Sequence, residues 1–118
     1  MAAYTIYHNP RCSKSRETLK LLEEKGIQPH IVEYLKTPPS AATVLALSKG
    51  LGLPVADFLR HKEDEYKALH LKGFTGTDEA LAEIVSEHPK LLERPIVVRE
   101  SDQHARIGRP PEAVLELL

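Results

Sequence analysis

The first 35 residues contain the pattern that most constrains the fold. Residues 4–7 are aromatic and β-branched, which predicts a short strand. From residue 13 to 25 the leucines recur with helical spacing, and Gly26 is a typical residue just beyond a helix end. Residues 31–35 then predict a second strand. A strand, a helix and a strand within about thirty residues favour a parallel pair joined by a right-handed crossover.

The rest of the chain adds helices and then a second pair of strands. Pro38 and Pro39 break the chain, and Ser40 is a candidate N-cap for a helical segment at 41–49. Further helical segments are predicted at 53–60 and 62–71. Thr77 is a second N-cap candidate, for a helical segment that stops at Pro89. Strands are predicted at 95–99 and 104–107, and a last helix from Pro110. The order β-α-β, helices, β-β-α predicts an α/β, thioredoxin-like mixed sheet with a helical segment inserted between its second and third strands. We expect one domain over 1–118, with the insertion at about 38–90.

Composition excludes several classes of protein. A net charge of −1 gives no basic field for nucleic acid or acidic membranes. There is no apolar run near the roughly 20 residues of a membrane span, and the N-terminus has no signal-peptide pattern. A single cysteine excludes an internal disulfide and a zinc site of several thiolates. We therefore expect a cytoplasmic monomer with no metal and no organic cofactor.

That single cysteine, Cys12, is the strongest candidate for chemistry. It lies between the first strand and the first helix, where backbone N–H groups and the helix dipole stabilise anions. Arg11, Lys14 and Arg16 are close in sequence, and Arg16 is one helical turn away on the same face. These features predict a reactive thiolate with a lowered pKa. His8 either orients this loop or interacts with the thiolate.

The spacing of residues around Cys12 excludes two kinds of cysteine chemistry. A phosphatase loop needs five residues between its cysteine and arginine, whereas only three separate Cys12 from Arg16. Ser15 occupies the position of the second cysteine in a Cys-x-x-Cys motif. The thiol must therefore be resolved by an outside thiol, either a glutathione-like molecule or another protein.

Arginines are concentrated near the C-terminus. Four lie between residues 94 and 109, with no lysine among them, and arginine offers a planar fork that matches oxyanions. Arg94 precedes the third strand and Arg106 ends the hairpin, so both could converge on Cys12 and bind a tetrahedral oxyanion. The alternative is that they are surface arginines paired with nearby glutamates. Pro95 opens a strand beside the thiol, and we expect its peptide bond to be cis.

Three segments resemble the arsenate reductase family of the glutaredoxin-dependent type. They are residues 8–16 (HNPRCSKSR), 93–98 (ERPIVV) and 106–112 (RIGRPPE). The resemblance implies a thioredoxin-like fold with a helical insertion and an oxyanion site. It also implies that the cysteine attacks arsenate, glutathione adds as co-substrate, and glutaredoxin reduces the intermediate and releases arsenite. By position the resemblance assigns the nucleophile to Cys12, the anion-binding arginines to Arg60, Arg94 and Arg106, and an assisting histidine to His8.

Two other functions remain open at this point. One is a glutathione-linked thiol oxidoreductase with a different substrate, such as a glutathione mixed disulfide. The other is a redox-sensing regulator that docks on the transcription machinery, because the resemblance extends to such proteins. Members of that regulator branch often carry Cys-x-x-Cys, whereas this chain has Ser15. Together with the arginines, this favours the enzyme.

Overall fold

The computed structural model describes residues 3–118, and a four-stranded mixed sheet lies at its centre. The order of strands across the sheet is β2-β1-β3-β4. β1 is parallel to β2 and antiparallel to β3, which is antiparallel to β4. This arrangement confirms the predicted fold class. The strands are β1 Tyr4–His8, β2 His30–Glu33, β3 Ile96–Arg99 and β4 Ala105–Ile107.

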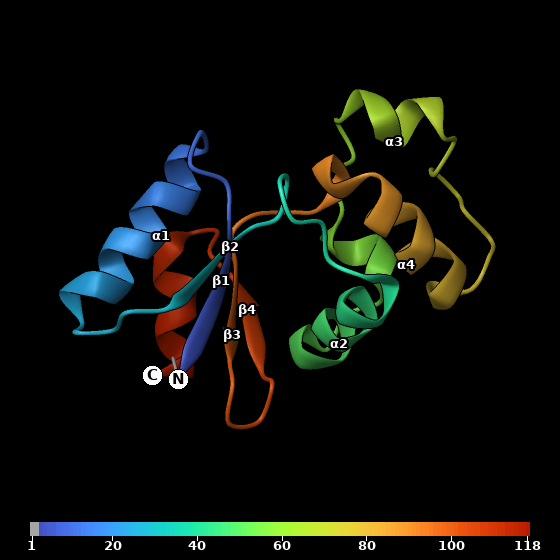
Figure 1. Ribbon diagram of the computed structural model, residues 1–118. Helices are drawn as coiled ribbons and strands as arrows, with labels where there is room; N and C mark the ends of the chain where they lie inside the picture. The colour runs from blue at the N-terminus through green and yellow to red at the C-terminus, as the bar shows by residue number, and fades with distance from the viewer. Residues whose placement is uncertain (1–2) are drawn as a thin grey trace.

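Helices cover both faces of the sheet. The α-helices are α1 Ser13–Glu24, α2 Ala41–Leu51, α3 Asp64–Ala68 and α4 Asp78–Glu87, and the 3-10 helices are η1 Val55–Phe58, η2 Pro89–Leu91 and η3 Pro111–Leu117. α1 and η3 lie on one side of the sheet, and the segment containing α2, α3 and α4 lies on the other (Figure 1). Ser40 and Thr77 cap α2 and α4, as the sequence predicts.

Two predicted helical segments are shorter than expected, and the C-terminal helix is of a different type. The segment predicted at 53–60 forms only the four-residue η1, because Leu59 becomes extended and pairs with Leu92 in an isolated bridge. The segment predicted at 62–71 is helical only in α3, and the chain takes a positive φ of 54° at His70. The final helix, η3, is 3-10 rather than α. Tertiary pairing thus overrides helical propensity in part of the middle region.

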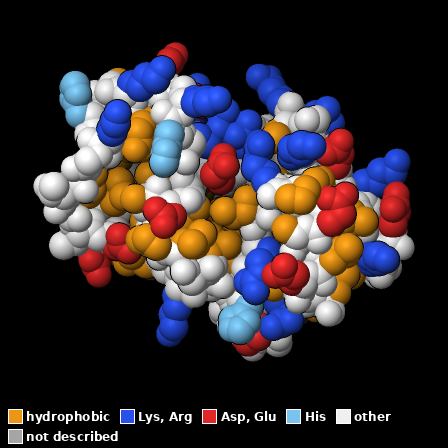
Figure 2. Space-filling view, turned by 180° about the vertical axis from the view of Figure 1, so that it is seen from behind, with side chains coloured by type: hydrophobic (Ala, Val, Ile, Leu, Met, Phe, Trp, Pro, Cys, Tyr) orange, Lys and Arg blue, Asp and Glu red, His pale blue; other side chains and the backbone are white. Residues whose placement is uncertain are grey.

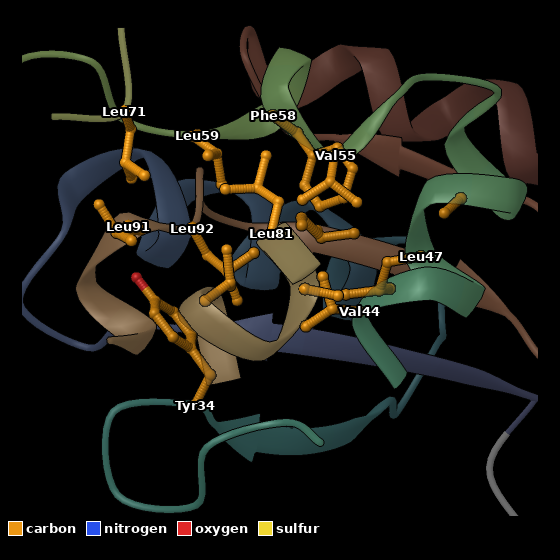
Figure 3. Close-up of a cluster of buried hydrophobic side chains, with 14 of the residues drawn as sticks. Tyr34, Val44, Leu47, Val55, Phe58, Leu59, Leu71, Leu81, Leu91 and Leu92 are labelled. Carbon is orange, nitrogen blue, oxygen red and sulfur yellow. The ribbon is translucent and has the colours of Figure 1, made fainter. Parts of the chain in front are cut away.

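The two faces of β3 supply two apolar cores. Ile96 and Val98 belong to the larger core, which α2, η1 and α4 complete and which Figure 3 shows in part. Val97, which lies between them, belongs to the smaller core under α1 and η3. This alternation is the period of two expected for a strand buried on both faces. Within residues 3–118, no helix is long and apolar enough to cross a membrane.

Strand direction brings several loops together at one edge of the sheet. β1 and β2 both end there, with His8 paired to Glu33. β3 begins there and β4 ends there, with Ile96 paired to Ile107. The segments that follow β1, β2 and β4 therefore meet the segment that precedes β3. Figure 2 shows Lys and Arg side chains gathered at the upper end of the molecule, which is the end at which β1 finishes in Figure 1.

Candidate active site

Cys12 stands at the N-cap of α1, at the edge where these loops meet. Its backbone is extended, and its N–H donates to the carbonyl of Asn9 at 3.0 Å. The residue is only 9% exposed. The backbone N–H groups of Lys14 and Ser15, which open the helix, act on the Cys12 sulfur and lower the pKa of its thiol. These donors lack partners within the helix, so a thiolate is a suitable acceptor.

Two arginines from the other end of the chain act on this sulfur, and one of them, Arg109, reaches it. Nη2 of Arg109 donates to Sγ of Cys12 at 3.6 Å, and Nε of Arg109 donates to the carbonyl of Arg94 at 2.9 Å. The Arg94 side chain is 15% exposed, and within residues 3–118 its buried Nε has no hydrogen-bond partner. A buried, unpartnered guanidinium donor is costly unless an acceptor enters the site. Glu93 lies 3.7 Å from Arg94 and 4.0 Å from Arg109, so the one buried guanidinium donor that stays without a partner in residues 3–118 is Nε of Arg94.

The surroundings of Cys12 favour the thiolate. Burial alone raises the pKa of the thiol, because it disfavours the charged form. The N–H groups of Ser15 and Lys14, with the positive charges of Arg94 and Arg109, outweigh that effect and hold the pKa below its usual value. A larger share of the sulfur is therefore nucleophilic near neutral pH.

Arg106 is not the hairpin arginine that approaches the thiol. Its Nε donates to Glu116 Oε2 at 2.8 Å, in a pair whose side chains are 39% and 66% exposed. Arg106 lies opposite Val97 in the sheet, so its side chain is on the face that η3 covers. η3 runs from the site back toward the edge where both termini lie, and Glu116 is near its end (Figure 1). The expectation that Arg106 lies beside Cys12 is corrected in favour of Arg109.

Sequence reasoning missed Arg109 although a signal for it is present. Arg94-Pro95 and Arg109-Pro110 are the two Arg-Pro pairs of the chain, and both peptide bonds are cis, the first as expected. The register of β3 with β4 brings the two pairs together, and Gly108 N–H donates to the Pro95 carbonyl at 2.9 Å. A Cβ at Gly108 would lie 2.8 Å from Pro95 Cγ and 2.5 Å from the Thr18 hydroxyl. Only glycine permits this close approach.

Arg60 lies near Arg94 through the bridge between Leu59 and Leu92. The Arg60 N–H donates to the Leu91 carbonyl at 2.7 Å, which fixes its backbone next to the segment that leads to Arg94. The Arg60 side chain is 30% exposed and pairs with Glu63 at 2.9 Å. The structure thus holds the Arg60 side chain in an ion pair with Glu63, and its role as an anion-binding arginine stays a prediction.

His8 is directed toward Ser15. Its Nδ1 lies 2.6 Å from the Ser15 hydroxyl, which also accepts from the Asn9 N–H at 3.0 Å. His8 Nδ1 and the Ser15 hydroxyl share one hydrogen bond, and its direction follows the histidine tautomer. Burial lowers the pKa of His8, the charge of Arg16 lowers it further, and Glu33 opposes both. Of the two roles considered for His8, the structure favours the orientation of the loop.

Arg16 supports the same loop. Its guanidinium donates to the Pro10 carbonyl at 2.9 Å, on the exposed side. The arginines that lower the pKa of Cys12 are Arg94 and Arg109, so the sequence assigned too much of that effect to Arg16. Elsewhere in the described chain, residues 3–118, no cluster of His, Cys, Asp and Glu could hold a metal ion.

Similarity to known proteins extends over most of the chain. The model of the ArsC family matches residues 7–117. Over 114 residues the chain is 55% identical to the protein named "Uncharacterized protein YfgD" of Escherichia coli (strain K12), covering 96% of this chain and 94% of the relative. It is 49% identical to the arsenate reductase of Haemophilus influenzae, covering 96% and 97%. A solved structure of arsenate reductase from Vibrio cholerae superposes with a TM-score of 0.93, at 52% identity, and covers 99% and 98%.

Proposed function

Because the chain belongs to the ArsC family, we propose that it reduces arsenate to arsenite, with Cys12 as nucleophile and with glutathione and glutaredoxin as electron donors. The single observation that carries this proposal is the approach of Arg109 to the Cys12 sulfur, beside the unpartnered Nε of Arg94. A thiolate beside two guanidinium groups can bind a tetrahedral oxyanion and attack its central atom.

The first half of the reaction forms two bonds to arsenic. The Cys12 thiolate attacks arsenate, a sulfur–arsenic bond forms, and one oxygen leaves as water after protonation. The thiol of glutathione then displaces a second oxygen in the same way. Arg94 and Arg109 stabilise charge that develops on the remaining oxygens, and Arg60 is proposed to assist from the margin of the site.

The second half transfers two electrons and frees the product. A glutaredoxin thiolate attacks the glutathione sulfur, a disulfide forms between them, and the bond from glutathione to arsenic breaks. Its electron pair stays on arsenic, which is reduced from As(V) to As(III). Water then hydrolyses the bond from Cys12 to arsenic, which releases arsenite and restores the thiol. This sequence needs an outside thiol because Ser15, and not a second cysteine, follows in the loop.

The test is an assay of purified protein with arsenate, glutathione, glutaredoxin and NADPH-linked recycling. We expect arsenate-dependent NADPH consumption that falls by at least about a thousandfold in Cys12→Ser. Ser13→Ala is the matched control, because Ser13 is exposed and adjacent, and it is expected to keep the wild-type rate. No arsenate-dependent turnover by a wild-type protein whose Cys12 alkylates rapidly at neutral pH would overturn the proposal. Turnover with glutathione mixed disulfides alone would then favour a different thiol oxidoreductase.

A further inference from the structure

Glu93 places a carboxylate between the two arginines that act on Cys12. Its Oε1 lies 3.7 Å from Nη1 of Arg94, and its Oε2 lies 4.0 Å from Nε of Arg109. The Glu93 N–H donates to the Phe58 carbonyl at 3.0 Å, which fixes the backbone of this residue in the segment that precedes β3. A negative charge therefore lies within the cationic part of the site.

The Arg109 guanidinium connects this carboxylate to the reactive sulfur. Its Nε lies 4.0 Å from Glu93, and its Nη2 donates to Sγ of Cys12 at 3.6 Å. The carboxylate and the sulfur thus lie beside one and the same guanidinium group. Because a guanidinium fork matches the spacing of two oxygens of an oxyanion, an anion of that size can touch the sulfur and also approach the carboxylate.

The carboxylate of Glu93 can accept a further hydrogen bond. Its contacts with the two arginines, at 3.7 and 4.0 Å, are longer than hydrogen bonds, and its side chain is 29% exposed. Nε of Arg94, on the neighbouring guanidinium, is a buried donor that has no acceptor within residues 3–118. An acceptor and a donor, each with unused capacity, therefore lie side by side.

This combination suits a tetrahedral oxyanion that still carries a proton. The deprotonated oxygens of such an anion accept from guanidinium groups, and its protonated oxygen donates to a carboxylate, which can only accept when it is ionised. Near neutral pH, arsenate and phosphate each keep at least one proton, whereas sulfate keeps none. Sulfate would therefore bring an unprotonated oxygen against the carboxylate, and that like-charge contact disfavours its binding.

We propose that Glu93 determines the specificity of the anion site by accepting a hydrogen bond from the protonated oxygen of the bound oxyanion, so that arsenate and phosphate bind and sulfate is rejected. The assignment rests on the proposed function and deepens it, because it states which oxyanions the site admits. Arginines alone attract any anion of suitable size, whereas a carboxylate among them selects for the proton.

The test compares how phosphate and sulfate slow the alkylation of Cys12 by iodoacetamide. It is carried out without glutathione or glutaredoxin and at constant ionic strength. The two anions have the same tetrahedral shape and differ in the proton. For equal protection, we expect the wild type to need at least about a hundredfold more sulfate than phosphate, as for a site that rejects a ligand lacking the proton it binds.

Glu93→Gln is the variant that tests the assignment. It keeps the size of the side chain and replaces the charge with an amide that can donate to sulfate as well as accept from phosphate. We expect the preference for phosphate to fall to within about tenfold, mainly because sulfate protects better. Without anions, the pH midpoint for alkylation of Cys12 should change little, because Arg109 still reaches the sulfur. Thermal melting checks that the variant is folded.

Glu116→Gln is the matched control. Glu116 also pairs with an arginine, since its Oε2 lies 2.8 Å from Nε of Arg106, but this pair does not involve Cys12. The control makes the same chemical change in an exposed ion pair, so the preference for phosphate should stay within about twofold of the wild type.

Each outcome decides the assignment. An equal preference for phosphate in the wild type and Glu93→Gln would overturn it, and so would a wild type that sulfate protects as well as phosphate does. If Glu93→Gln raises the alkylation midpoint and weakens protection by both anions alike, Glu93 only positions the arginines and the assignment fails. No protection of wild-type Cys12 by phosphate would also overturn it, because no protonated oxyanion would then reach Glu93.

The same measurements separate this assignment from the proposed function. A preference for phosphate that depends on Glu93, in a protein that turns over no arsenate, would support the assignment and overturn the reductase activity. Arsenate turnover by a protein whose preference does not depend on Glu93 would support the reductase and overturn the assignment.

Discussion

The thiol loop, residues 8–16, and the arginine hairpin, residues 94–109, meet at the same site but are built differently. Within the thiol loop, the contacts join residues at most seven positions apart, such as His8 with Ser15. The contact from Arg109 to Cys12 joins residues 97 positions apart. The loop therefore presents the sulfur through short-range geometry, whereas the charges beside it depend on the pairing of three strands.

Within the arginine hairpin, two arginines that are close in sequence have different partners. Arg106 and Arg109 are three residues apart, yet one pairs with Glu116 and the other reaches Cys12. Arg106 is still in β4 and follows its alternation, whereas Arg109 lies beyond the strand, after Gly108. Position relative to the strand end, and not proximity in sequence, decides which arginine serves the site.

The largest effect expected from this comparison is a difference in arsenate turnover between variants of these two arginines. Arg109→Ala removes a donor from the sulfur and is expected to lower arsenate turnover by roughly 10²- to 10³-fold. It should also raise the pH midpoint for alkylation of Cys12, because a charge that lowers the pKa of the thiol is lost. Arg106→Ala breaks an exposed ion pair, which contributes about 1 kcal/mol or less, and a hydrogen bond to the Ala105 carbonyl, and neither involves Cys12, so turnover should stay within about threefold. Equal losses in both variants would contradict the placement of these side chains.

A smaller effect tests the thiol loop. Ser15→Ala removes a fully buried hydroxyl and leaves His8 Nδ1 and the Asn9 N–H without their partner. The free energy of unfolding is expected to fall by about 1–3 kcal/mol, seen as a melting temperature lower by several degrees. The backbone N–H of Ser15 remains, so the alkylation midpoint of Cys12 should change little. A large rise in that midpoint with unchanged stability would show that the hydroxyl acts on the thiol.

The smallest expected effect is the contribution of His8 to the pH dependence of the free energy of unfolding. Its pKa is lowered in the folded protein, first by burial, so protonation favours the unfolded state. Stability from this group is fully present above the ordinary histidine value of about 6.5 and decreases as pH falls through that value toward the folded pKa. Urea unfolding at pH 7.5 and 5.5 should show a smaller difference for His8→Gln than for the wild type. His70→Gln, which alters an exposed histidine, is the control and should leave the difference unchanged.

Much of the fold follows from local patterns in the sequence. The order of strands and helices along the chain is as predicted. The helix that begins after Cys12 and the caps at Ser40 and Thr77 also form as predicted. These features depend on periodicity and on hydrogen bonds within a few residues. The middle region was less predictable, because the pairing of Leu59 with Leu92 ended one helical segment early. A contact between residues 33 positions apart leaves no local signal.

The sequence by itself determined a lone thiol at a helix N-terminus, followed by serine where a second thiol could stand. It also determined that arginines would be abundant near the C-terminus, although not which of them would serve the thiol. Only the tertiary structure decided that Arg109 reaches Cys12 and that Arg106 turns to Glu116. The physical reason is that strand register and the close approach at Gly108 set side-chain directions, and both arise only when distant segments pair.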